Sequence, residues 1–223
     1  MVITWLGFSS FEIETKQQEN DVRLIVDPYQ NETGLRFPRT LQAQLVLSSR
    51  DHEDQNNIDT VEGGGEKPYR IDGPGEYEVN GVFVYGIEAP RAINQENNKS
   101  KNQKHTIWRI ETEGMSVAHL GALNRELTDK ELEQFPSIDI LMVPIGGNDV
   151  MTPKMAIQAI EKIEPRIVIP MYYSLPGVKQ ELLELSAFLK EHAGAKTEEL
   201  SKLKIKKSDL PAEDTLTKIL TRG

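Results

Sequence analysis

Cysteine is absent from the 223-residue chain, so disulfide bonds, thiolate metal sites and a cysteine nucleophile are all excluded. The lack of disulfides does not limit folding, because a chain of this length can bury a sizeable hydrophobic core. No change in composition along the sequence marks a domain boundary. We therefore expect a single domain over residues 1–223.

Long apolar runs are lacking as well. Nowhere do the roughly 18 consecutive apolar residues of a membrane span occur, and residues 1–7 lack the basic region of a signal peptide. Positive charge is in deficit, because 26 basic residues stand against 35 acidic ones and the formal net charge is -9. Such a surface repels nucleic acid and anionic membranes. We expect a soluble cytoplasmic protein with no nucleic-acid or membrane partner.

Short β-branched and alternating runs, separated by Gly, Pro, Asn and Asp, predict many strands. We expect strands at residues 2–6, 11–15, 22–26, 45–48, 69–71, 75–79, 82–87, 106–110, 116–120, 140–144 and 167–171, and a closing strand pair at 203–206 and 216–220. Helical spacing predicts helices at 129–135, 155–163 and 179–191. Thr152 is the expected N-cap of the second helix, with Pro153 at its first position.

Two similar strand-rich halves, each with helices toward its end, predict an α/β (α+β) protein in which two sheets face each other under outer helices. Between the halves, residues 94–104 are polar and without period. We expect this segment to form a mobile surface loop.

The segment of greatest chemical interest follows the apolar residues 45–47. There the chain enters a dense cluster of ionisable residues, the arrangement in which hydrolases build two-metal sites. The cluster contains one histidine, His52, and one well-placed aspartate, Asp54. Arg50 and Gln55 stand where further ligands would be expected. The sequence therefore raises the question of whether the chain still performs chemistry.

Seven short motifs occur in a fixed order along nearly the whole chain. They are ITWLGFSSF at 3–11, VDPY at 26–29, the loop at 45–55, PGEYEV at 74–79, HLG at 119–121, VPIGG at 143–147 and IPMYY at 169–173. In this order they resemble the metallo-β-lactamase superfamily, and more narrowly its small, stand-alone UlaG-like hydrolase branch. The resemblance implies an αββα four-layer sandwich with a site between the sheets at one end.

The family signature implies six ligand positions: H-x-H-x-D-H after a strand, a later bridging Asp and a late His. Together these residues hold one or two Zn²⁺ or similar ions, which activate a bound water. On this sequence the six positions fall on Arg50, His52, Asp54, Gln55, Ala122 and Tyr172. Only His52 and Asp54 keep a ligand type. A catalytic zinc site normally takes three protein ligands and leaves one position for water, and neither site reaches that count.

The substitutions are chemically consistent with one another. A buried carboxylate without a cation is costly, and an arginine supplies a permanent positive charge with up to five donors. We hypothesise that Arg50 lies near the former metal position, paired with Asp54 or Asp51, and that Gln55 and Tyr172 complete the hydrogen bonds.

Three functional hypotheses follow. The favoured one is a non-catalytic pseudoenzyme without a cofactor, whose former site is a polar core or a pocket for a small molecule or protein. The alternative is a hydrolase of esters, lactones or phosphoesters that holds one Zn²⁺ or Mn²⁺ with His52, Asp54 and His119. The third is an interaction protein, and a homo-oligomer is compatible with it.

Several residues near the cluster allow two interpretations. His119 is either a leftover ligand or a hydrogen-bonded structural residue. Asp51 and Glu53 either recruit a hard cation such as Mg²⁺ or belong to a solvated loop. His105 and His192 are expected at a loop edge and at a solvent-facing helix end, and neither is assigned a role.

Overall fold

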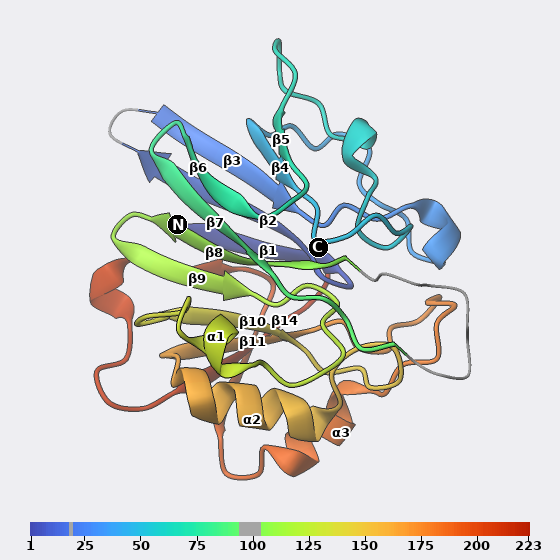
Figure 1. The fold of residues 1–223 in the computed structure, drawn as a ribbon, viewed down its shortest axis with the longest axis vertical. Coiled ribbons are helices and arrows are strands. Elements are labelled where there is room, and N and C mark those ends of the chain that lie inside the picture. The colour runs from blue at the N-terminus through green and yellow to red at the C-terminus, as the bar shows by residue number, and fades with distance from the viewer. Residues whose placement is uncertain (18–19, 94–103) are drawn as a thin grey trace.

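A computed structural model describes residues 1–17, 20–93 and 104–223 of the chain. It consists of two β-sheets that face each other (Figure 1). The two sheets confirm the predicted sandwich. The predicted surface loop lies outside the described residues except for Lys104.

The first sheet has six strands and is formed mainly by the N-terminal part of the chain. Its order is β13 (Leu203–Lys204), β1 (Val2–Gly7), β2 (Ser10–Gln17), β3 (Asn20–Val26), β4 (Leu45–Leu47) and β5 (Tyr69–Ile71). In β1, Ile3 and Trp5 are buried whereas Val2 and Thr4 are half-buried. This alternation is typical of a sheet with one face on the core and the other toward solvent.

The second sheet has eight strands. Its order is β12 (Lys196–Leu200), β14 (Leu216–Leu220), β11 (Ile167–Met171), β10 (Ile140–Pro144), β9 (Met115–His119), β8 (Thr106–Thr112), β7 (Val82–Glu88) and β6 (Gly75–Val79). The strands β9, β10 and β11 run parallel, and every residue in them is buried. The unbroken apolar sequences of β10 and β11 follow from burial on both faces, whereas β9 also contains Ser116 and His119.

The α-helices of the described residues lie against the eight-stranded sheet (Figure 1). They are α1 (Asp129–Leu132), α2 (Pro153–Ile163) and α3 (Leu185–Glu191). The other sheet is accompanied by the short 3-10 turns Asn31–Thr33 and Ile58–Thr60. On its outer face Arg23 pairs with Glu12 at 3.1 Å and with Glu14 at 3.2 Å. Charged side chains of this kind can face solvent without a covering helix. The outer layer on the six-stranded sheet is therefore thinner than in a full αββα sandwich.

Several elements differ from the prediction. The first helix, predicted at 129–135, ends at Leu132. The last helix begins at Leu185 rather than at residue 179, because Leu183 is bound in extended form, with its N–H on the Gly146 carbonyl at 2.7 Å. The tail strands do not pair, since β13 joins β1 and β14 joins β11 and β12. The strand β12 is absent from the prediction because its sequence, KTEEL, has no apolar alternation.

No helix in the described part of the chain is both long and apolar enough to cross a membrane.

The start of α2 offers a test of the fold. As predicted, Thr152 is the N-cap, its side chain accepts from Met155 N at 3.3 Å, and Pro153 occupies the first turn. Thr152→Ala removes this acceptor and should lower the free energy of unfolding by about 1 kcal/mol. Urea denaturation measures the loss. Thr152→Ser keeps the acceptor and should restore most of the stability; equal losses in both variants would contradict the capping role.

Candidate functional site

The predicted site residues gather at one end of the sandwich. Strands β3 and β4 are parallel, as are β9, β10 and β11, so the segments that follow these strands emerge at the same edge of each sheet. In α/β sheets such carboxyl ends are the usual place for a site. Side chains from both sheets meet here, as the contacts described below show.

The centre of this end is the carboxylate of Asp54, which is fully buried. Arg50 Nη2 donates to Asp54 Oδ2 at 2.5 Å, and His52 Nδ1 lies 2.8 Å from Oδ1. The Tyr172 hydroxyl also donates to Oδ2. Gln180 Nε2 lies 3.5 Å from the same oxygen, and its Oε1 lies 3.2 Å from the Tyr172 hydroxyl oxygen. The loop after β4 is thereby tied to the segment after β11.

The electrostatics of this network follow from burial and charge. Burial alone raises the pKa of the Asp54 carboxyl, but the Arg50 guanidinium, His52 and the Tyr172 hydroxyl outweigh it and hold the pKa well below its usual range. Burial opposes the charge on Arg50 too, yet the neighbouring Asp54 raises the pKa of the guanidinium. Burial and the Asp54 charge raise the pKa of Tyr172 well above its usual value. The network therefore holds an anion, a cation and a neutral phenol.

A second arginine extends the network toward Ala122. Arg91 Nε donates to the Ala122 carbonyl at 2.8 Å, and its Nη2 contacts both the carbonyl and the carboxylate of Asp149, the latter at 2.9 Å. The other carboxylate oxygen of Asp149 lies 3.8 Å from Arg50 Nη2. Asp149 thus bridges the two arginines.

A separate buried cluster surrounds Asp27, which follows β3. Its carboxylate accepts from Ser49 N at 2.7 Å, from Ser49 Oγ at 3.0 Å and from Gln55 Nε2 at 2.6 Å. Gln55 Nε2 also donates to Ser9 Oγ at 2.9 Å. His119 Nε2 lies 4.0 Å from the Asp27 carboxylate and 2.7 Å from the Ser9 carbonyl. This cluster contains no arginine or lysine partner among the described contacts of Asp27.

The predicted residues are divided between the Asp54 cluster, the Asp27 cluster and the exposed part of the loop. Arg50 pairs with Asp54 and Tyr172 completes a hydrogen bond there, as hypothesised. Gln55 does not join them, since its amide nitrogen faces Asp27. Asp51 is exposed and accepts from Asn56 Nδ2 at 2.7 Å.

The remaining candidates lie apart from Asp54. Glu53 is exposed, so it belongs to the solvated part of the loop. His105 lies at a loop edge, directly before β8, as predicted, but its ring is buried and has a structural contact, since its Nε2 accepts from Ala122 N at 3.0 Å. Burial, aided by the charges of Arg50 and Arg91, lowers the pKa of His105 well below its usual value, so the ring is a neutral acceptor. His192 lies 3.0 Å from Thr217 Oγ1.

The backbone at this end is unusual. Phe8, Asp27 and Tyr172 adopt left-handed conformations with φ of 49°, 49° and 56°. Aspartate tolerates this region, but bulky residues such as Phe8 and Tyr172 rarely occupy it. Tyr172 N donates to the Phe8 carbonyl at 3.0 Å, and the two rings pack edge to face at 5.3 Å. Contacts between the two sheets therefore hold the strained turns in place.

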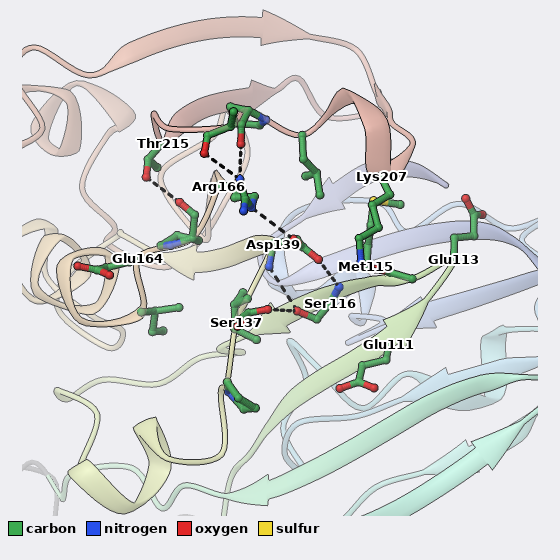
Figure 2. Close-up of a pocket in the computed structure, with 18 of the residues that line it drawn as sticks. Glu111, Glu113, Met115, Ser116, Ser137, Asp139, Glu164, Arg166, Lys207 and Thr215 are labelled. Atoms are coloured by element: carbon green, nitrogen blue, oxygen red, sulfur yellow. Dashed lines mark hydrogen bonds and ion pairs between the residues drawn. The ribbon is translucent and has the colours of Figure 1, made fainter.

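A groove of about 1580 Å³ lies at the opposite end of the strands (Figure 2). Its walls include the segments that precede β9, β10 and β11. Asp139 accepts from Ser116 N at 2.9 Å, and Arg166 donates to the Pro211 carbonyl at 2.6 Å. No residue of the Asp54 or Asp27 clusters lines it, so the groove takes no part in the candidate site.

Comparisons with known proteins agree with this architecture. Residues 2–172 match the family model described as "Beta-lactamase superfamily domain", which is well over half of the chain. This chain belongs to the metallo-β-lactamase superfamily. The recognised family and its fold are thereby confirmed.

Several similar proteins carry functional names. The chain is 27% identical over 196 residues to a "UPF0173 metal-dependent hydrolase" of Thermococcus onnurineus strain NA1, covering 77% of this chain and 84% of that protein. A protein of the same description from Methanopyrus kandleri is 26% identical over 217 residues, covering 86% and 92%. The crystal structure of a proposed Zn-dependent hydrolase of the superfamily from Thermotoga maritima matches with a TM-score of 0.76 and 28% identity over 98% of both chains.

The residues of this chain do not fit the metal centre that the superfamily implies. The Asp54 carboxylate is bound by a guanidinium, and Gln55 offers an amide in place of an imidazole, with its nitrogen donating to Asp27. Within residues 1–17, 20–93 and 104–223, no three His, Asp or Glu side chains come together as a metal-binding group. The chemistry of the donor set is therefore that of an ion-pair network.

Sequence reasoning missed four residues of this end. The sequence gives a weak indication that Asp149 is a site residue, because it follows a buried strand and the Gly146-Gly147 pair, as polar site residues often do. Asp27 lies within a recognised motif but was assigned no role. Arg91 stands in a loop without any pattern around it, and Gln180 falls in a segment that was predicted as helix but precedes α3, so only the fold brings them to the site.

The buried ion pair can be tested by a double-mutant cycle. Arg50→Met leaves the Asp54 carboxylate buried without its cation and should lower the free energy of unfolding by about 3–5 kcal/mol. Adding Asp54→Asn removes the stranded charge and should recover much of that loss. Urea denaturation of the two single variants and the double variant measures the coupling. Additive effects would contradict a direct pairing.

The Asp27 cluster predicts a pH effect. Burial raises the pKa of Asp27 from 3.8 to about 7, against the opposing hydrogen bonds of Ser49, Ser9 and Gln55. Between these pH values the folded chain holds a proton that the unfolded chain has lost. The stability that Asp27 contributes is therefore fully present below about pH 4 and is lost as the pH rises through about 7.

Asp27→Asn cannot ionise, so its free energy of unfolding should rise relative to the wild type between pH 4 and pH 8, by on the order of 4 kcal/mol. Urea titrations across this range measure the difference, and effects common to both proteins cancel. Asp59→Asn, at an exposed aspartate, is the control and should give a nearly flat difference. A flat difference for Asp27→Asn as well would refute the assignment.

Proposed function

We propose that this chain is a non-hydrolytic member of the metallo-β-lactamase superfamily, in which an ion-pair network has replaced the metal centre and the site serves as a ligand pocket. The observation that carries the proposal is the Arg50 guanidinium at 2.5 Å from the buried Asp54 carboxylate. In a hydrolase of this family the same carboxylate would be free to bind a cation.

Electrostatics support this reading. A divalent ion about 4 Å from a guanidinium would be repelled by about 8 kcal/mol at the effective dielectric of a partly buried site. Two surviving ligand types offer too little to offset that cost, since a catalytic zinc normally takes three protein ligands. The other positions offer a guanidinium, an amide whose nitrogen donates to Asp27, a methyl group and a phenol hydroxyl that donates to Asp54, and none of them is an imidazole or a carboxylate.

The alternative is a metal-dependent hydrolase of esters, lactones or phosphoesters, and the names of the relatives favour it. It would use His52, Asp54 and His119 around one Zn²⁺ or Mn²⁺. In the structure, however, His119 Nε2 lies 2.7 Å from the Ser9 carbonyl oxygen and 4.0 Å from the Asp27 carboxylate. A site of this kind would require Arg50 to leave Asp54.

Metal content separates the two functions. Protein purified without chelator or His-tag, then loaded with Zn²⁺ or Mn²⁺ and desalted, should contain far less than one ion per chain by inductively coupled plasma mass spectrometry. The fourfold variant Arg50→His, Gln55→His, Ala122→Asp and Tyr172→His restores the family signature. It should bind one or two ions per chain because the ligand count again reaches that of a catalytic site.

Alanine substitutions of His52 and His192 serve as the comparison. About one ion per wild-type chain, lost on His52→Ala and retained on His192→Ala, would overturn the proposal in favour of the hydrolase. His192 is the matched control because it contacts Thr217, away from Asp54. Hydrolysis assays with a phosphodiester and a lactone then report whether any bound ion supports turnover.

A further inference from the structure

The groove of about 1580 Å³ lies at the end of the sandwich opposite the Asp54 and Asp27 clusters (Figure 2). Cavities for drug-sized ligands measure roughly 300–1,000 Å³, so this groove has room for a longer molecule. Its walls come from the β6–β7 turn, the β8–β9 turn, the segments before β10 and β11, and the chain between β13 and β14. Distant parts of the sequence thus form one concave surface.

Acidic residues outnumber basic residues in the lining of the groove by seven to two. Both basic side chains bind main-chain carbonyls of the groove itself. Arg166 donates to the Pro211 carbonyl at 2.6 Å, and its Nε lies 3.8 Å from Asp139 Oδ1. Lys207 donates to the Gly114 carbonyl at 2.5 Å. The cations of the groove therefore compensate only a small part of its negative charge.

Three acidic side chains of the groove are left without a counterion. The other four have cationic partners, which are Arg109 for Glu111, the Met1 ammonium for Glu113, Arg166 for Asp139 and Lys196 for Asp214. Glu161, Glu164 and Glu213 are exposed, and their carboxylates have no ion pair or hydrogen bond within the described part of the chain. A cleft lined by charges of one sign concentrates ions of the opposite sign. The groove therefore attracts cations.

The carboxylates of the groove do not form a metal site. Among the residues that the structure describes, no three His, Asp or Glu side chains come together as a metal-binding group. In Figure 2, Glu164 lies on one side of Ser116 and Asp139, whereas Glu111 and Glu113 lie on the other. Charges distributed in this way match several positive charges along an extended molecule better than one metal ion.

An apolar surface accompanies the charges. Phe83 on β7 is 46% exposed, and Glu111 is its partner across the strand pair. Ile163 and Leu210 are half-buried in the same groove. The hydrocarbon stem of a lysine or arginine packs on apolar surface while the charged end remains free to meet a carboxylate. The groove offers both of these contacts.

From this geometry we infer that the groove docks a basic peptide segment of a partner protein, in which lysine or arginine residues are interspersed with apolar ones. The size of the groove, the uncompensated carboxylates and the exposed Phe83 each match one property of such a segment. The inference is independent of the proposed function, because no residue of the groove belongs to the Asp54 or Asp27 clusters.

The test measures binding of the acetylated heptapeptide Lys-Leu-Lys-Ser-Lys-Leu-Lys to the full chain by calorimetric titration at low ionic strength, where screening is weak. The triple variant Glu161→Gln, Glu164→Gln and Glu213→Gln removes the unpaired charges of the groove and should weaken binding about tenfold.

The matched control removes the same charge elsewhere. Glu32, Glu62 and Glu66 are exposed and lie outside the groove. The triple variant Glu32→Gln, Glu62→Gln and Glu66→Gln should therefore weaken binding less than about twofold, because it changes the net charge but not the groove.

A second pair of variants tests the apolar contact. Phe83→Thr keeps a residue that favours strands but removes the ring, and it should weaken binding of the heptapeptide about fivefold. Tyr69→Thr changes an aromatic residue on β5 that is 52% exposed and outside the groove, and it should leave the affinity unchanged.

The inference is overturned if the wild type does not bind the heptapeptide, or if the two triple variants lose equal affinity, because binding would then follow net charge alone. Unchanged binding by Phe83→Thr, or binding of spermidine as tight as that of the heptapeptide, would also overturn it. The metal content of the chain tests the proposed function and leaves these results unaffected, so the two failures can be told apart.

Discussion

A fully buried carboxylate must be compensated, and this constraint at Asp54 organises one end of the molecule. Arg50, His52 and Tyr172 all turn toward it, and through Tyr172 it ties the loop after β4 to the segment after β11. The arginine in turn requires its own surroundings, including the bridge through Asp149 to Arg91. The positions of these polar side chains between the sheets therefore follow from the need to compensate the negative charge of Asp54.

The superfamily and the site give different kinds of information. Family membership accounts for the two sheets and for the convergence of strand ends, which any member shares. It does not determine the chemistry, because function depends on the side chains placed there. In this chain the inherited frame holds two polar clusters of different character: one is strongly ionic around Asp54, and the other, around Asp27, is held by hydroxyl and amide donors.

Sequence reasoning recovered the strands well because their signals are local. The strands β5, β6, β10 and β11 have the predicted bounds, since each is a short apolar or alternating run between turn residues. The pairing of Arg50 with Asp54 was also accessible, because the two residues are four apart in one loop. By contrast, the last helix was predicted too long, because a long-range hydrogen bond holds Leu183 in extended form.

The partners contributed by distant loops could not be predicted in the same way. Arg91 and Gln180 meet the site only because the two sheets are stacked, and the turn of Gln55 toward Asp27 depends on a carboxylate 28 residues away. The burial of His105 likewise depends on tertiary packing.

The left-handed turns at Phe8, Asp27 and Tyr172 have an evolutionary consequence. Conformations of this kind cost of order 1–3 kcal/mol each and persist only where surrounding structure enforces them. Here aromatic packing and a main-chain hydrogen bond between Phe8 and Tyr172 provide that enforcement. Such a backbone can outlast exchanges of the ionisable side chains around it, so the chemistry at this end of the molecule can change without a change of fold.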